Sequence, residues 1–437
     1  MRRLPVVADL TLVTAGAMVA NVAGYLLQLL AGRWLGVGGY SEFASLLAMQ
    51  LLCAVPALAL QNVVARELVR GASVAEVRRL QRRCAAIVAG IAVVLVPVVA
   101  VILHVNWVAA AGALSAAPVL VLVSGEQGVL QGGRRFRSLA MVLGGTGIAR
   151  VTPALIALAL GGGSATALWS TAAGLAVAAF GAHRAAGPSH TPEETRNLPS
   201  NPLPSESSAA EPRETRTPAP FPHSRTRSSA LQGVRERAGG AGVLAVLRAA
   251  QVQAALMALS SVDLIVARVV LDDADASRYA LGAIATKIAF WLPQAVGVVL
   301  YPRMAQPQHS ARAVRDALGV LSGIGVLAVA GAAVLAPLAP LFAGQDYAPI
   351  EGWLWLFALD GALLALLQGA LLSAIAVDRT APAAITWAGL IAEIAIMLTF
   401  ARSLPLLLGT ATAVAATVTA AIVIVVLRAA RPGTTVS

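Results

Sequence analysis

Charged residues are scarce in this chain: Asp, Glu, Lys and Arg together make up 12% of its 437 residues, about half of their share in soluble proteins. Apolar residues make up 58%, and the mean hydropathy is +0.78. Such a composition excludes an ordinary soluble domain. The sequence therefore predicts a polytopic membrane protein.

Lysine is nearly absent. Of the 32 basic residues only Lys287 is a lysine, and the formal net charge is +11. In a soluble domain this basicity would suggest a nucleic-acid partner, but almost every apolar run here must lie in lipid, and we expect no nucleic acid. The arginine richness is typical of a high-GC genome and favours a bacterial origin.

Potential metal ligands are few and badly spaced. The two cysteines, Cys53 and Cys84, lie in or beside apolar runs, which indicates neither a disulfide framework nor a thiolate metal site. The five histidines form no HxxxH or HExxH pattern. We expect no metal centre and no cofactor.

Long apolar runs dominate instead, and twelve of them approach or exceed the roughly 20 residues that a transmembrane helix needs. We predict spans at Leu10–Ala31, Phe43–Val63, Cys84–His104, Leu114–Gln131, Leu139–Leu160, Thr166–Ala182, Leu244–Val270, Tyr279–Tyr301, Leu318–Phe342, Trp353–Val377, Ala383–Phe400 and Leu404–Leu427.

The connections between these spans alternate in charge. The loops after spans two, four, eight and ten contain arginine, whereas those after the odd-numbered spans contain little. By the positive-inside rule, both termini are expected in the cytoplasm of a multi-pass protein of the plasma (inner) membrane. Trp34, Trp107, Trp353 and Trp355 would then form an aromatic belt at the outer interface.

A segment of different composition, residues 183–240, separates the sixth and seventh spans. It is rich in Pro, Ser, Thr and Arg and shows no apolar periodicity, which predicts a disordered cytoplasmic linker. A spacer is the favoured interpretation, and docking of partners such as glycan-assembly enzymes is the alternative. The expected domains are a six-helix lobe (1–182), the linker (183–240) and a second six-helix lobe (241–437), arranged as parallel repeats.

Three stretches resemble one known family: AGRWLGVGGYSEFASLLAMQLLCAVPALALQNVVAREL, GVLQGGRRFRSLA and SSVDLIVARVVLDDADASRYALGAIATKIAFWLPQAVGVVLYPRMA. They are similar to the polysaccharide flippases of the multidrug/oligosaccharidyl-lipid/polysaccharide (MOP) exporter superfamily. The resemblance implies two six-helix lobes that open alternately to each side and move an undecaprenyl-diphosphate-linked oligosaccharide outward. The long linker departs from the family, and twelve spans are fewer than the fourteen of the lipid-linked peptidoglycan precursor flippases.

Charges inside predicted spans are costly and normally face a cavity or a partner. Arg150, about 16 Å into its span, is the best candidate for a contact to a substrate diphosphate. An ion pair with an acid such as Glu126 is an equally weighted alternative. Lys287 is a second candidate for phosphate capture, with neutralisation of Asp263 as its alternative, and Arg248 lies near the cytoplasmic end of its span, as a gate or interface residue.

The remaining intramembrane polar residues suggest two further roles. Asp263, Asp360 and Glu393 could exchange a proton or bind Na⁺ and so couple transport to an ion gradient, or could serve only as polar contacts between helices. Asn21 and Gln28, two turns apart on one face, could bind sugar hydroxyls or form a small polar seam.

Three functions are compatible with these observations. The first is export of a lipid-linked glycan for cell-surface polysaccharide biosynthesis. An ion-coupled multidrug exporter of the same superfamily is the second, although Arg150 and Lys287 suit an organic cation poorly. A membrane-embedded glycan polymerase is least favoured, because the longest outward loop has about eleven residues; we therefore expect a transporter rather than an enzyme.

Overall fold

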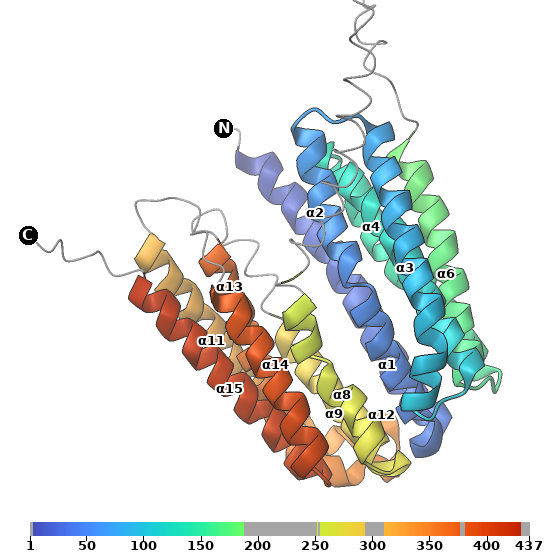
Figure 1. The fold of residues 1–437 in the computed structure, drawn as a ribbon, viewed down its shortest axis with the longest axis vertical. Helices are drawn as coiled ribbons and strands as arrows, with labels where there is room; N and C mark the ends of the chain where they lie inside the picture. The colour runs from blue at the N-terminus through green and yellow to red at the C-terminus, as the bar shows by residue number, and fades with distance from the viewer. Residues whose placement is uncertain (1–2, 188–250, 252–253, 293–309, 376–380, 430–437) are drawn as a thin grey trace, which may run out of the picture.

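The computed structural model describes residues 3–187, 251, 254–292, 310–375 and 381–429. These residues form helices in two bundles (Figure 1). Every one of the twelve predicted spans overlaps a helix, and eight segments of the described chain are long and apolar enough to cross a membrane. The predicted all-α polytopic fold with two lobes is confirmed.

The first two crossings differ from the prediction. Helix α1 (Arg3–Cys53) contains the first span and half of the second, and only Gly36 interrupts it, with φ 64° and ψ −178°. Glycine adopts this backbone conformation readily because it has no Cβ, and the chain reverses there. The first two predicted spans leave residues 32–42 as a connecting loop, and this prediction is wrong. The helix is interrupted at Gly36 alone, and α2 (Val55–Val69) completes the second crossing.

Four further helices complete the first lobe: α3 (Val74–Ile102), α4 (Trp107–Gly132), α5 (Phe136–Ala159) and α6 (Ser164–Ala186). Helix α3 starts well before its apolar run because Ser73 and Glu76 form a capping box, with hydrogen bonds of 3.2 and 3.1 Å between the side chain of each and the amide of the other. Helix α6 continues past residue 182, and residues 188–240 of the predicted linker lie outside the described chain.

The second lobe contains α8 (Val262–Val270), α9 (Asp273–Trp291), α11 (Ser310–Leu335), α13 (Leu354–Ile375), α14 (Ala381–Phe400) and α15 (Leu404–Ala429). Two 3₁₀ helices, η2 (Ala336–Leu338) and η3 (Gln345–Trp353), flank the short α12 (Ala339–Ala343). The seventh span is not one continuous helix as predicted, because residues 254–259 are helical but Ser260 and Ser261 form a turn before α8.

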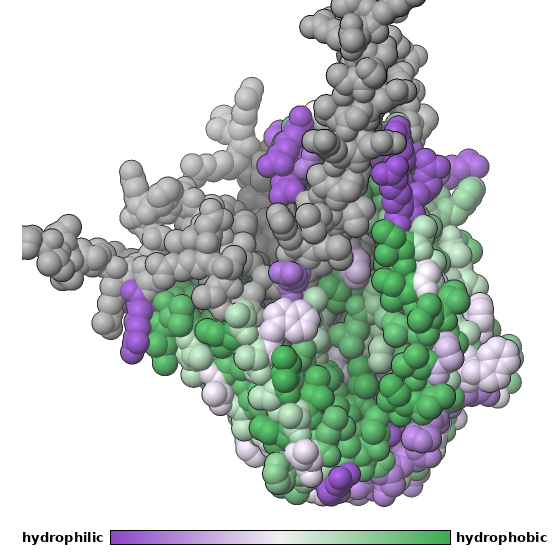
Figure 2. Space-filling view, in the orientation of Figure 1, coloured by the Kyte–Doolittle hydropathy of each residue, from purple (hydrophilic) through white to green (hydrophobic). Residues whose placement is uncertain are grey.

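Hydrophilic residues gather at the two ends of the bundle, and an apolar band lies between them (Figure 2). We call one the basic end; its arginines are Arg66, Arg70, Arg78, Arg79, Arg82, Arg83, Arg134, Arg135, Arg137 and Arg184. We call the opposite end of the bundle the acidic end; its carboxylates are Glu42, Asp272, Asp273, Asp275, Asp346 and Glu351. Arg268 and Arg278 pair with carboxylates at the acidic end, so the two ends differ mainly in the excess of arginine at the basic end, which is typical of a cytoplasmic face.

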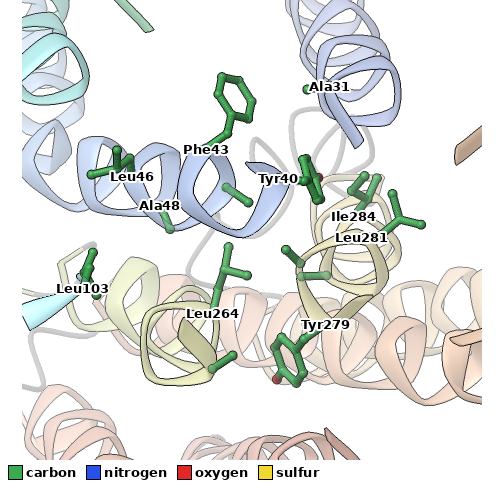
Figure 3. Close-up of a cluster of buried hydrophobic side chains, with 14 of the residues drawn as sticks. Ala31, Tyr40, Phe43, Leu46, Ala48, Leu103, Leu264, Tyr279, Leu281 and Ile284 are labelled. Atoms are coloured by element: carbon green, nitrogen blue, oxygen red, sulfur yellow. The ribbon is translucent and has the colours of Figure 1, made fainter. Parts of the chain in front are cut away.

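The lobes meet through α1, which packs against α8, α9, α12 and η3. Figure 3 shows part of the apolar cluster at this junction, where Tyr40 of α1 points toward Leu281 and Ile284 of α9, and Leu264 of α8 lies against α1. In Figure 1 the lobes lie close together at the acidic end and diverge toward the basic end.

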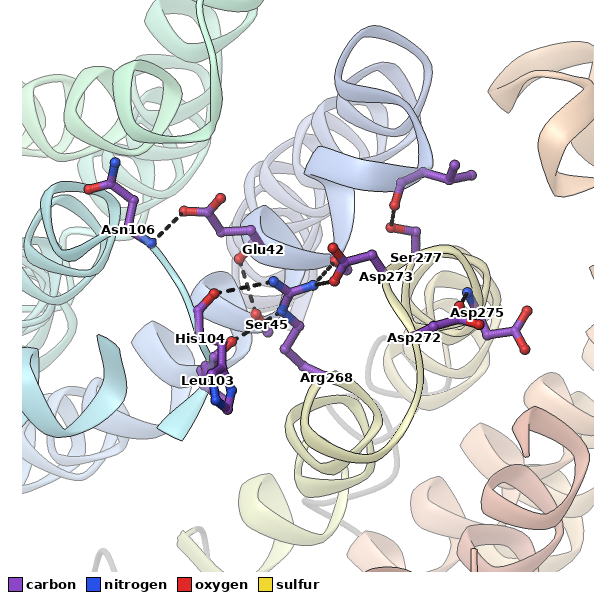
Figure 4. Close-up of polar contacts among 12 residues, drawn as sticks. Glu42, Ser45, Leu103, His104, Asn106, Arg268, Asp272, Asp273, Asp275 and Ser277 are labelled. Carbon is purple, nitrogen blue, oxygen red and sulfur yellow. Dashed lines mark hydrogen bonds and ion pairs between the residues drawn. The ribbon is translucent and has the colours of Figure 1, made fainter. Parts of the chain in front are cut away.

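Hydrogen bonds reinforce the closed acidic end (Figure 4). Arg268 of α8 donates to the Ser41 hydroxyl at 2.6 Å and to the Leu103 carbonyl at 3.2 Å, both in the first lobe, and it also pairs with Asp273. Ser277 donates to the Val37 carbonyl. We call this set of contacts the inter-lobe latch.

Candidate functional site

Three carboxylates are buried together in the second lobe. Asp263 on α8 and Asp360 on α13 are each 4% exposed, and Glu393 on α14 is 1% exposed. They lie close enough to interact electrostatically with one another. We call these residues the acidic cluster. Burying three negative charges without compensation costs many kcal/mol, so the cluster needs bound cations or protons.

The acidic cluster is only partly satisfied by the protein. The Tyr279 hydroxyl donates to Asp263 Oδ2 at 2.8 Å. Within the described residues, however, Asp263 Oδ1 and Glu393 Oε2 are buried without any hydrogen-bond partner. A buried acceptor left without a hydrogen bond costs about 1–3 kcal/mol. A transferable proton or cation bound at either oxygen would remove this cost.

Lys287 of α9 lies next to this cluster. Its Nζ donates to the Ser261 hydroxyl at 3.4 Å, and its charge interacts with Asp263 and Asp360. In the described chain it forms no ion pair within 4.0 Å, and its charge is shared between two carboxylates, one of which is Asp263, the acid that it was predicted to neutralise.

Tyr25 links Lys287 to the first lobe. Its hydroxyl donates to the Lys287 backbone carbonyl at 3.2 Å, and it lies one helical turn after Asn21 on α1. The acidic cluster and its lysine are therefore next to the surface on which the two lobes touch.

Arg150 lies on α5 at a comparable depth in the first lobe. Helices α1 and α5 run in parallel at backbone contact, with Gly144 against Gly16 and Gly147 against Ala20. One turn further along the same stripe of α1, a Cβ on Gly24 would meet nothing within 4 Å, so space has opened between the helices at the level of Arg150.

The Arg150 guanidinium has no partner in the described part of the chain. Its Nε is buried and makes no hydrogen bond. Asn21 and Gln28, both half-buried on α1, likewise make no hydrogen bond to the described residues. The structure thus places an unpaired cation on the helix packed against α1, and it places Asn21 and Gln28 on the face of α1 that also carries Tyr25, the contact to Lys287.

Glu126 belongs elsewhere. It accepts two hydrogen bonds from Arg78, at 3.0 and 2.9 Å, and a third contact from His183 Nδ1 at 2.9 Å, near the basic end. The alternative of an Arg150–Glu126 pair is wrong, and Glu126 has no contact with the acidic cluster. Arg248 lies outside the described residues.

Several residues at these sites were missed by sequence reasoning. Tyr279, Arg78 and His183 have no feature in the sequence that marks them as partners of buried carboxylates. Tyr25 carries a weak signal, since it follows Asn21 by four residues on the same helical face. Helical spacing from a known polar residue could have found Tyr25, but pairing across helices could not be read from the chain.

The described residues contain no group of three His, Cys, Asp or Glu side chains placed to hold a metal ion.

Comparison with known proteins identifies the fold. No family model and no curated protein matches the sequence. Among solved structures, the lipid II flippase MurJ in an inward closed conformation aligns with a TM-score of 0.67 over 96% of this chain and 87% of that one, at 11% identity.

Two multidrug transporters align almost as well. A mutant of the Vibrio cholerae MATE transporter VcmN gives a TM-score of 0.62 at 16% identity, over 98% of this chain and 97% of that one. An inward-facing multidrug resistance MATE transporter of the MOP superfamily gives 0.56 at 13% identity, over 97% and 94%. The two-lobe architecture implied by the resemblance to MOP exporters is confirmed as a fold.

Proposed function

Starting from a fold that lipid flippases and multidrug transporters share, we propose that this chain is a flippase for a polyprenyl-diphosphate-linked oligosaccharide. It would move this lipid from the cytoplasmic to the outer leaflet of a bacterial plasma membrane, for cell-surface polysaccharide biosynthesis. The basic end would face the cytoplasm, with both termini on that side.

The observation that carries this proposal is the unpaired Arg150 guanidinium beside open space on α1. A buried cation without a counterion is expensive. A diphosphate offers the charge and the oxygen geometry that a guanidinium fork binds best. Asn21 and Gln28 supply unpaired amides within a few turns, suited to the hydroxyl groups of a sugar.

Alternating access supplies the mechanism. The latch holds the acidic end closed while the lobes diverge toward the basic end, so this conformation would accept substrate from the cytoplasmic leaflet. Opening the latch and closing the basic end would release the headgroup outward. The long prenyl chain would stay in lipid while the charged headgroup moves between the lobes.

The acidic cluster supports proton coupling within the same proposal. Protonation of its carboxylates would remove the attraction that draws Lys287 toward them. Because Tyr25 of α1 binds the Lys287 backbone carbonyl, a movement of α9 would be transmitted to the contact between lobes.

A multidrug exporter is the second candidate, and the acidic cluster is the observation that favours it, since carboxylates attract organic cations. Arg150 opposes it by electrostatic repulsion. The neighbours in fold are transporters and flippases, and a polymerase activity has no support among them.

The deciding experiment measures binding and flipping by the purified full-length chain in proteoliposomes. A fluorescent undecaprenyl-diphosphate oligosaccharide is expected to flip with the wild type, and Arg150→Ala is expected to lower affinity by at least tenfold, through loss of a charge-assisted hydrogen bond worth about 1.5–3 kcal/mol. Arg137→Ala, an exposed arginine on the same helix, is the matched control and should behave as wild type.

Two outcomes would contradict the proposal. One is equal flipping by the wild type and Arg150→Ala. The other is transport of an organic cation such as ethidium that strengthens when Arg150 is removed, with no flipping of the glycolipid, which would establish the exporter instead.

A further inference from the structure

A basic cavity of about 720 Å³ lies on the flank of the first lobe that faces away from the second lobe. It is formed by the first turns of α3, the end of α6 and, as its floor, α4. Its walls carry Arg78, Arg79 and Arg82, while Glu126 and Phe180 line the floor and the far side. Neither the acidic cluster nor Arg150 contributes to it.

The cavity contains more positive charge than the protein neutralises. Glu126, with a side chain 4% exposed, is fully engaged by the Arg78 fork and His183. Arg79 and Arg82 are exposed and form no ion pair or hydrogen bond with the described residues. Two guanidinium groups are thus left to bind an anion, beside a third that Glu126 holds in place.

The depth of the cavity matches the headgroup region of a bilayer. Arg82 lies eight residues after Val74, the first residue of α3, which is about 12 Å along the helix. The lining combines arginines of the basic end with the apolar residues Leu122, Ala179 and Phe180.

Small exposed residues follow the cavity on both α3 and α6 in the direction of the membrane centre. On the α3 stripe that follows Arg82, Ala86 and Gly90 are exposed, and a Cβ on Gly90 would meet nothing within 4 Å. On the facing stripe of α6, Ala173 and Ala176 are exposed as well. Small residues on both helices leave room for an acyl chain below a headgroup held at the arginines.

We propose that this cavity binds the phosphate headgroup of an anionic phospholipid, such as phosphatidylglycerol, from the leaflet at the basic end. Arg79 and Arg82 bind the phosphate oxygens, Arg78 completes the positive wall, and the acyl chains lie along the exposed small residues of α3 and α6. Basic pockets between transmembrane helices on the cytoplasmic side recognise anionic lipids in this way. The assignment to the cytoplasmic leaflet rests on the orientation given under the proposed function; the binding itself does not.

The test measures lipid retention without any transport substrate. The full-length protein is extracted from vesicles of phosphatidylcholine containing 20% phosphatidylglycerol, and its bound lipid is counted by native mass spectrometry. We expect the Arg79→Ala/Arg82→Ala double variant to retain roughly tenfold less phosphatidylglycerol than the wild type. Arg134→Ala/Arg137→Ala removes the same charge from the same end outside the cavity, and should retain wild-type levels.

A competition arm separates the lipid from free phosphate. Inorganic phosphate at millimolar concentration should leave the bound phosphatidylglycerol in place, because the acyl chains contribute to binding. Equal losses in both double variants would show general surface attraction and overturn the proposal, as would displacement by phosphate or the absence of retained lipid in the wild type. Unfolding temperatures in pure phosphatidylcholine confirm that both variants fold.

Discussion

Glu126 and Asp263 are both carboxylates inside an apolar run of the sequence. In the structure they differ in whether a cation neutralises them. Glu126 is neutralised by Arg78, which comes from a different helix 48 positions away. Asp263 keeps one oxygen without a partner among the described residues. The sequence could show that both charges need an explanation, but only the packing of helices determines which of the two is already compensated.

Removing one charge from the acidic cluster tests its role in coupling. We expect the wild type in proteoliposomes to flip its substrate faster when a pH gradient is imposed. Asp360→Asn keeps the shape of the side chain and removes its titration, so the gradient should no longer change the rate, while substrate affinity stays within about twofold.

Asp316→Asn, at an exposed position of α11, is the control and should keep the gradient dependence. A wild-type flipping rate that does not respond to the pH gradient would contradict proton coupling. The same measurement with an imposed Na⁺ gradient would then test coupling to Na⁺.

At the scale of elements, hydropathy located the helices and missed their interruptions. Each of the twelve apolar runs overlaps a helix in the described part of the chain, because a chain in lipid must satisfy its backbone hydrogen bonds internally. The turn at Ser260 and Ser261 has no proline or glycine to signal it. The reversal at Gly36 lies among several glycines, of which only this one has a positive φ within α1.

Close packing of α9 against α13 gives a prediction about stability. A Cβ on Gly361 would clash with the Thr286 backbone carbonyl oxygen, which cannot move without shifting α9. Gly361→Ala should therefore cost about 1–3 kcal/mol, in the range of overpacked cores, and lower the unfolding temperature in detergent.

The matched control is Gly331→Ala in α11, where a Cβ would meet nothing within 4 Å. This substitution should leave the unfolding temperature unchanged or raise it, because alanine favours helix by up to about 1 kcal/mol over glycine. Similar unfolding temperatures for the two variants would show that α9 and α13 are not in tight contact.

At the scale of the whole molecule, the inter-lobe latch joins the two lobes at the end where they lie close together. The single side chain of Arg268 donates hydrogen bonds to the Ser41 hydroxyl and to the carbonyl groups of Leu103 and His104 in the first lobe. Arg268→Ala removes these bonds at once and should shift the population toward conformations open at the acidic end.

Spin labels report this shift. Trp107→Cys and Phe400→Cys place labels on exposed positions of the two lobes, in a chain whose Cys53 and Cys84 are replaced by alanine. Arg268→Ala should move the distance distribution to longer values, and Arg402→Ala, an exposed arginine in the loop between α14 and α15, should not. An unchanged distribution in Arg268→Ala would mean that apolar packing alone keeps this end shut.

The glycine contacts between α1 and α5 have a mechanical consequence. Gly16 and Gly147 bring the two backbones together with no flexible side chains between them, so α1 is rigidly joined to its own lobe. Its contacts with α9 are made mainly through side chains, such as Tyr25. In the proposed alternating-access cycle, we therefore expect the lobes to move relative to each other at the contact between α1 and α9 rather than at the contact between α1 and α5. Substitutions at the α9 side should alter the speed of the cycle, whereas those at the α5 side should alter whether the lobe assembles at all.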